Sequence, residues 1–186
     1  MGIFDILKPR TAELPIQMTL KAVQKIRKGR SLGIIDNVFR DKVHPVKGSI
    51  VCCDLGFLNI GVEHSGVYVG DGKIVHRDGG GYLDIVPPKT FLERFDGING
   101  AISVYVSCCG TEAVGSKEVA KRARRALKNP NFEGYNLLTN NCHLFCQYCL
   151  TNDDPGLLDF TFASLEKTLE EEYGFDNWRV WDIDIY

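Results

Sequence analysis

Alternating hydrophobic and polar residues dominate the middle of the chain and predict β-strands. Residues 64–69 alternate, Gly70-Asp71-Gly72 forms a turn, and residues 73–76 continue the pattern. An Asp-Gly pair between two β-rich runs is a strong local signal for a hairpin. Three more short runs predict further strands, over residues 48–54, 82–86 and 101–106, and Pro87-Pro88 ends the second of these.

Helical patterns follow the strands. Residues 116–128 place small and apolar side chains on one face and six basic residues elsewhere. Residues 142–150 follow a cluster rich in N-cap residues, which predicts a second helix. We also expect a short amphipathic helix over 16–28, an acidic helix over 162–173, and an edge strand or docked tail over 178–186. Strands first and helices after indicate the α+β class.

Charge is distributed unevenly along a chain of 186 residues whose formal net charge is only −2. Lys and Arg against Asp and Glu number 10 and 4 in residues 1–47, 10 and 10 in residues 48–150, and 2 and 10 in residues 151–186. These three regimes predict a basic N-terminal arm with a short helix (1–44), a central domain (45–152) and an acidic C-terminal extension packed on that domain (153–186).

The opposite charges of the two ends suggest an intramolecular contact or a contact with a partner. We expect the acidic extension to lie against the basic arm or the helix over residues 121–125. The alternative is that the basic arm makes a peripheral contact with an anionic membrane. No apolar run approaches the roughly 20 residues of a membrane-spanning helix. The net charge gives no reason to expect nucleic acid as a partner.

The chain has seven cysteines, and their pattern indicates whether the protein works in a reducing or an oxidising compartment. Cys52-Cys53 and Cys108-Cys109 are adjacent pairs, and neighbouring cysteines rarely form a disulfide without strain. An odd count also leaves at least one thiol unpaired. Free thiols in a reducing compartment fit this pattern best, and we expect a cytoplasmic protein.

Cys142 is the residue whose position predicts chemistry. It follows Asn140 and Asn141 at an expected helix start, where free backbone N–H groups and the helix dipole lower the pKa of a thiol. The same N–H groups can stabilise an oxyanion on a bound carbonyl. A nucleophile also needs a base and an orienting partner. The predicted hairpin would bring His64 and His76 together on one face of the sheet, and we expect the Cys142 helix to pack against that face.

Two sequences, EHSGVYVGDGKIVH at residues 63–76 and NNCHLF at residues 140–145, carry a family resemblance. The first resembles the two-histidine hairpin of the lecithin:retinol acyltransferase (LRAT) family, and the second is similar to that family's Asn-Cys-Glu-His-Phe box. Gly48-Ser49-Ile50-Val51 resembles the first strand of the family, and residues 119–127 with 135–138 resemble its approach to the cysteine. The resemblance covers roughly residues 45–152.

The resemblance implies a circularly permuted papain-like fold of the NlpC type, with an antiparallel sheet followed by helices. It implies that Cys142 is the nucleophile, His64 the general base and His76 the residue that orients the base. Further candidates for contacts with substrate or oxyanion are Tyr68, Asn141 and His143. Here His143-Leu144 stands where the animal enzymes have Glu-His, which leaves the substrate open.

Three functions remain open at this point. The first is a cysteine-dependent hydrolase or acyltransferase that works through a thioester, without cofactor or metal, on a lipid acyl ester or a peptide or isopeptide amide. The second is an interaction module with the same fold and no turnover. The third is a zinc site built from Cys142, His143, Cys146 and Cys149. Arg77 either meets an anionic group of a substrate or is solvated.

Overall fold

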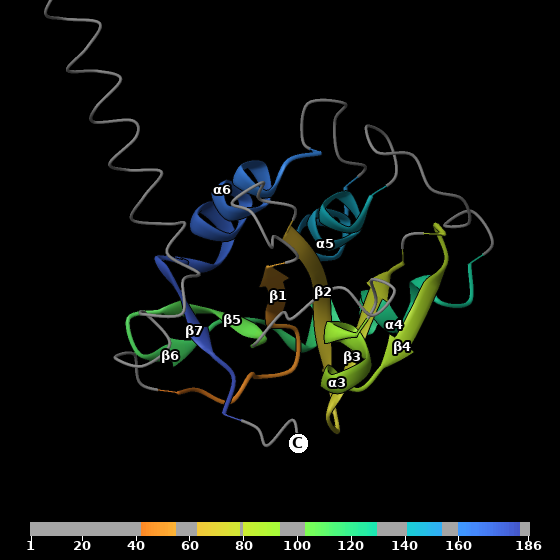
Figure 1. Cartoon of the computed structure of the whole chain (residues 1–186). Helices are drawn as coiled ribbons and strands as arrows, with labels where there is room; N and C mark the ends of the chain where they lie inside the picture. The colour runs from red at the N-terminus through yellow and green to blue at the C-terminus, as the bar shows by residue number, and fades with distance from the viewer. Residues whose placement is uncertain are drawn as a thin grey trace, which may run out of the picture. The chain divides into compact units, whose positions relative to one another are not determined.

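The computed structural model describes residues 42–54, 63–78, 80–93, 103–129, 141–153 and 160–182. These residues form seven strands and four helices, so the mixed α+β class is confirmed (Figure 1). The helix expected over residues 16–28 lies outside the described residues, and so does Asn140.

All strands belong to one antiparallel sheet. Their bounds are β1 (Ile50–Asp54), β2 (Glu63–Gly70), β3 (Lys73–Arg77), β4 (Leu83–Val86), β5 (Tyr105–Cys109), β6 (Glu112–Ala113) and β7 (Asn177–Val180). The order across the sheet is β4-β3-β2-β1-β5-β6, and β7 pairs with β5 along its other edge. The edge strand expected near the C-terminus is therefore present.

The four helices of the described residues are α3 (Pro88–Leu92), α4 (Lys117–Ala126), α5 (Cys142–Thr151) and α6 (Phe162–Tyr173). The last three agree with the predicted segments within two residues at each end. None of the helices in the described ranges is long and apolar enough to cross a membrane.

The β2–β3 hairpin forms as its sequence predicts. Gly70 pairs with Lys73, which leaves Asp71 and Gly72 as a two-residue turn. Both turn residues have positive φ, 56° and 64°, as a type I′ turn requires. This turn fixes the register of the hairpin, and the register decides which side chains share a face.

Two local features differ from the expectations. The strand expected over 101–106 is present but runs over Tyr105–Cys109, because these residues form the ladders with β1 and β7; residues 101 and 102 lie outside the described residues. Pro87-Pro88 does end β4, but it also begins α3, which the sequence reading missed. Pro88 occupies the first helical turn, where a missing N–H costs nothing.

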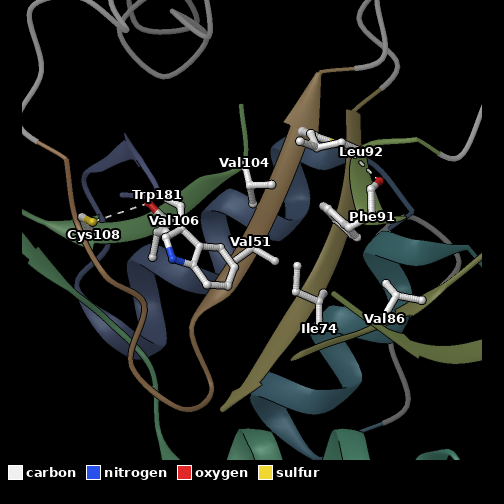
Figure 2. Close-up of a cluster of buried hydrophobic side chains, with 10 residues drawn as sticks. Val51, Ile74, Val86, Phe91, Leu92, Val104, Val106, Cys108 and Trp181 are labelled. Carbon is white, nitrogen blue, oxygen red and sulfur yellow. Dashed lines mark hydrogen bonds between the residues drawn. The ribbon is translucent and has the colours of Figure 1, made fainter. Parts of the chain in front are cut away.

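The two faces of the sheet are covered differently. One face carries a buried cluster that Figure 2 shows in front of the strands, made of Val51, Cys53, Ile74, Val86, Phe91, Leu92, Val104, Val106, Cys108 and Trp181. We call this the Phe91 face. The other face is packed by α4 and α5, with α6 resting on α5. Figure 2 shows these helices behind the strands, and we call this the helix face.

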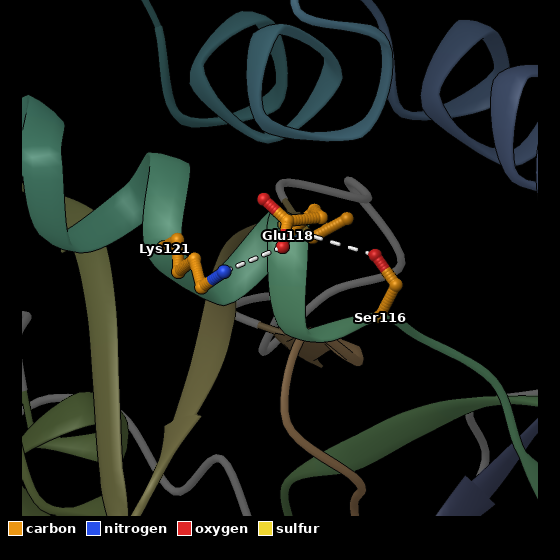
Figure 3. A network of polar contacts seen from close by, with 4 residues as sticks. Ser116, Glu118 and Lys121 are labelled. Atoms are coloured by element: carbon orange, nitrogen blue, oxygen red, sulfur yellow. Dashed lines mark hydrogen bonds and ion pairs between the residues drawn. The ribbon is translucent and has the colours of Figure 1, made fainter.

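Capping contacts fix the start of α4. The Ser116 hydroxyl accepts a hydrogen bond from the Val119 N–H at 3.3 Å, and Lys121 pairs with Glu118 at 2.6 Å (Figure 3). Gly48, with φ +91°, lies so close to Ser116 that a Cβ atom there would sit 1.9 Å from its carbonyl oxygen. Only glycine allows this contact between the segment before β1 and the N-cap residue of α4.

The described end of the basic arm meets the acidic extension. Val43 bridges Trp181, and Lys42 and His44 approach the Asp182 carboxylate at 3.3 and 3.8 Å. Residues 42–44 therefore contact the extension, and the rest of the expected contact lies outside the described residues. The extension also supplies α6 and β7 to the fold, so residues 160–182 are an integral part of the same packing unit.

Candidate functional site

The two histidines of the hairpin form a buried pair. Gly66 pairs with His76 across β2 and β3, which places His64 diagonally opposite His76 on the same face. His64 Nε2 lies 2.7 Å from His76 Nδ1, and both rings pack against Phe91 with centroids 4.9 and 5.4 Å away. The prediction that the hairpin joins these imidazoles is confirmed.

Cys142 is the first residue of α5, as its sequence context predicts. The Asn141 side chain caps the helix by accepting a hydrogen bond from the Leu144 N–H at 2.9 Å. Its amide nitrogen donates to the carbonyl of Phe160 at 2.8 Å, which ties the cap to the segment before α6. Asn141 thus positions the thiol, and both ends of its side chain are engaged in doing so.

A cluster of polar side chains surrounds the thiol. The Cys142 sulfur lies 3.8 Å from His143 Nδ1, and the same ring nitrogen lies 2.9 Å from the Ser65 hydroxyl. Cys146, one turn further along α5, donates to Ser65 at 3.5 Å. The hydroxyl of Ser65 therefore links β2 to three residues of the helix, and we call Ser65, Cys142, His143 and Cys146 the thiol cluster.

The thiol cluster and the histidine pair lie on opposite faces of the sheet. Neighbouring residues of a strand point to opposite faces, and Ser65 contacts α5 while His64 contacts Phe91. The expectation that the Cys142 helix packs against the histidine face is therefore wrong. In place of His64, the imidazole that the structure sets beside the thiol is that of His143.

Burial dominates the ionisation of the thiol. Only 8% of Cys142 is exposed, and desolvation raises the pKa of its thiol. Hydrogen bonds from the Ser65 N–H and hydroxyl, and from the N–H groups of Cys142 and His143, oppose this effect and lower the pKa. In the resting protein the desolvation is larger, so the thiol is protonated at neutral pH.

His143 is a neutral imidazole in this environment. Burial lowers its pKa to about 4, because the charged form would lose its hydration. His143 Nδ1 lies 2.9 Å from the Ser65 hydroxyl and 3.8 Å from the Cys142 sulfur. In the tautomer that carries its proton on Nε2, Nδ1 can accept a proton from a neighbouring thiol. The Phe162 ring covers His143 with a centroid distance of 5.4 Å.

Tyr68, one of the candidate oxyanion residues, is placed elsewhere. Its ring packs edge-on against Trp181 at 5.0 Å, on the Phe91 face. Its hydroxyl accepts from the Gly72 N–H at 3.4 Å, at the turn of the hairpin. Because His64 and Ser65 lie at the other end of β2, Tyr68 does not join either group.

Two residues of the helix face gain importance from the structure. Ser65 was not singled out in the sequence, and only the alternation of the hairpin could have placed it opposite His64. Arg77 follows His76 on β3 and was expected either to meet a substrate or to be solvated. It is 1% exposed, and its Nη1 donates to the Gly81 carbonyl at 2.9 Å. Solvation of Arg77 is therefore ruled out.

The zinc alternative finds no ligand set in the described ranges, where no three His, Cys, Asp or Glu side chains converge in a way that could hold a metal. All seven cysteines are free thiols. Burial raises the pKa of Cys146 and Cys149, as expected for thiols that pack as small hydrophobes.

Comparisons with models of protein families, with curated proteins and with solved structures found no significant match to this chain.

Proposed function

We propose that the protein is a cysteine-dependent acyl-transfer enzyme in which Cys142 is the nucleophile and His143 the general base. The observation that carries the proposal is the 3.8 Å approach of the Cys142 sulfur to His143 Nδ1 at the first turn of a helix. The resemblance to the LRAT family supports Cys142 as the nucleophile, whereas the base that it implies, His64, differs from the one proposed here. Seven free thiols favour a reducing compartment, such as the cytoplasm.

The reaction would proceed in two steps. Cys142 sulfur attacks the carbonyl carbon of an ester or amide while its proton moves to His143 Nδ1. Collapse of the tetrahedral intermediate breaks the bond to the leaving group, which takes the proton from the imidazolium and leaves a thioester. Water or a second acceptor then gives its proton to His143 and attacks the thioester, which frees the thiol.

The start of α5 offers stabilisation for the intermediate. Backbone N–H groups of Cys142 and His143 lie beside the sulfur, which puts them next to the carbon that the sulfur attacks. Donors preorganised in a buried site stabilise a developing oxyanion more than water does. This role replaces the one expected for Tyr68. The substrate would be a lipid acyl ester or a peptide or isopeptide amide, and a lipid substrate would be reached by peripheral contact with an anionic membrane.

The test is an acylation experiment read by intact-mass spectrometry. The protein is exposed to a panel of acyl esters and peptide amides, and we expect the mass of one acyl group to be added. Cys142→Ser should lose the adduct, whereas Cys109→Ser, which removes the one exposed thiol, should keep it. An adduct that persists in folded Cys142→Ser would contradict the proposal.

An interaction module without turnover is the second candidate, and burial of the thiol favours it. Desolvation raises the pKa of Cys142 and lowers that of His143, so the resting pair is neutral. A thiol kept for packing would show these same properties. The absence of any adduct across the panel, from a protein that is fully folded, would favour this second candidate.

A further inference from the structure

We propose that Arg77 is the positioning residue that stabilises the negative charge on the Cys142 sulfur as its proton moves to His143. This inference deepens the proposed function and rests on it, because the thiolate is the species that attacks a carbonyl. The positive charge of Arg77, on the strand next to that of Ser65, would lower the pKa of the thiol.

The register of the hairpin places Arg77 beside the thiol cluster. Gly66 pairs with His76 and Val67 with Val75, and Ser65 and Arg77 are the next residues along β2 and β3 beyond the Gly66–His76 pair. Because side chains alternate along a strand, Ser65 and Arg77 are both on the face opposite to that of His76. Ser65 binds the Cys142 sulfur through its N–H and hydroxyl, and Arg77 therefore lies one strand away from that contact.

Burial makes the charge of Arg77 depend on its neighbours. Arg77 is the largest of the fully buried side chains among the residues that the structure describes. Desolvation lowers its pKa, while the negative charges of Cys142 and Asp78 raise it, with Cys142 the stronger of the two. Attraction between two charges acts equally on both, so the guanidinium that gains from the thiolate also stabilises it.

The other groups around Cys142 do not supply a positive charge. His143 on its own helix is neutral, because burial lowers its pKa to about 4. Cys146 is a buried thiol, Ser65 contributes a hydroxyl from β2, and α6 contributes the Phe162 ring that covers His143. Within this set, only Arg77 on β3 carries a charge opposite to that of a thiolate.

The test is the pH dependence of Cys142 alkylation by iodoacetamide, which is measured without any substrate. Cys142, Cys146 and Cys149 fall in one tryptic peptide, residues 129–167, so fragment-ion mass spectrometry must assign the label. Arg77→Met and Arg77→Gln are two neutral replacements of different polarity. We expect each to raise the midpoint of the profile by about one pH unit or more, with about tenfold slower labelling at neutral pH.

Two further variants separate charge from structure. Arg77→Lys restores the positive charge and should recover part of the shift. Arg122→Met removes a cation that donates to the Cys149 and Leu150 carbonyls, near the other end of α5, and should leave the midpoint unchanged. An unchanged midpoint in whichever neutral variant folds would overturn the inference. An equal shift in Arg122→Met would also overturn it.

The alkylation midpoint and the acyl adduct test the role of Arg77 and the proposed function independently. A shifted midpoint in a protein that forms no acyl adduct would support the role of Arg77 and count against the enzyme. An unshifted midpoint in a protein that does form the adduct would support the enzyme and remove Arg77 from its mechanism. Thermal unfolding of each variant, followed by circular dichroism, establishes that the protein compared is folded.

Discussion

The two faces of the β2–β3 hairpin carry two different histidine environments. On the Phe91 face, His64 and His76 lie 2.7 Å apart under an aromatic ring, in a cluster of apolar side chains. On the helix face, His143 shares the Ser65 hydroxyl with a thiol and sits beside Cys142. The Phe91 face also carries the Cys53 thiol, which pairs with His64 across β1 and β2. We assign the proposed chemistry to the helix face, where α5 packs.

The largest expected effect on the free energy of unfolding comes from removing one phenylalanine from each face of the sheet. Phe91 contacts the rings of His64 and His76, and Phe162 contacts His143 and stacks on Trp178. We expect Phe91→Ala and Phe162→Ala each to lower the free energy of unfolding by about 3–5 kcal/mol in urea titrations, because each leaves a cavity.

The matched pair also reports on the site. At a temperature where both variants are folded, Phe162→Ala should change the alkylation profile of Cys142, because it uncovers His143. Phe91→Ala should leave that profile unchanged, since the sheet lies between. A change in the Phe91 variant alone would show that the histidine pair, and not His143, governs the thiol.

Low pH should reduce the free energy of unfolding through protonation of His143 on the helix face. The pKa of His143 is about 4 in the folded protein and about 6.5 when unfolded. The unfolded state therefore binds the proton first as the pH falls, and stability is fully present above pH 6.5. It should be lost progressively towards pH 4, by about 3 kcal/mol. Urea midpoints in His143→Gln should fall less steeply over this range, and equal slopes in both proteins would contradict the assignment.

Removing the Ser65 hydroxyl tests the link between the strand and the helix. Ser65→Ala should lower the free energy of unfolding by about 2 kcal/mol, because buried partners in α5 lose their hydrogen bonds. Ser107→Ala is the matched control, as its buried hydroxyl bonds to Ile50 and Val114 away from the thiol. Both should be destabilised in urea, but only Ser65→Ala should alter the Cys142 profile. The same alteration in Ser107→Ala would mean that it reflects lost stability alone.

The smallest expected effect concerns the cap of α5. Asn141→Ala should cost about 1 kcal/mol, as for loss of an N-cap, and it should also raise the alkylation midpoint of Cys142, because the helix start is less fixed. Thr161→Ala removes the corresponding cap of α6, an acceptor for the Ser164 N–H. It should cost a similar amount in a urea titration with no change in the midpoint. A shift in both variants would assign the effect to α6 packing.

The hairpin and its histidine pair could be predicted because both depend on local information. Asp71 and Gly72 define the turn, and the turn fixes the register that joins His64 to His76. The start of α5 at Cys142 was equally local, since Asn141 is a strong cap. All three features follow from residues close together in the sequence.

The face on which α5 packs could not be predicted in this way. It depends on contacts such as that of Ser65 with His143, which are 78 positions apart. Val67 and Val75 are fully buried and lie on the same face as Ser65, so an apolar stripe was visible. The sequence pattern did not say which helices would cover it. The burial of Arg77 could not be predicted either. It also depends on long-range packing, and a charged residue at a strand end is usually exposed.

The central claim, that His143 and not the His64–His76 pair serves Cys142, is tested most directly by one comparison. The rate of Cys142 alkylation by iodoacetamide is measured at neutral pH in His143→Gln and His64→Gln, with folding checked by circular dichroism. We predict a lower rate in His143→Gln, which lacks the base beside the thiol, and an unchanged rate in His64→Gln. A lower rate in His64→Gln with an unchanged rate in His143→Gln would contradict the account.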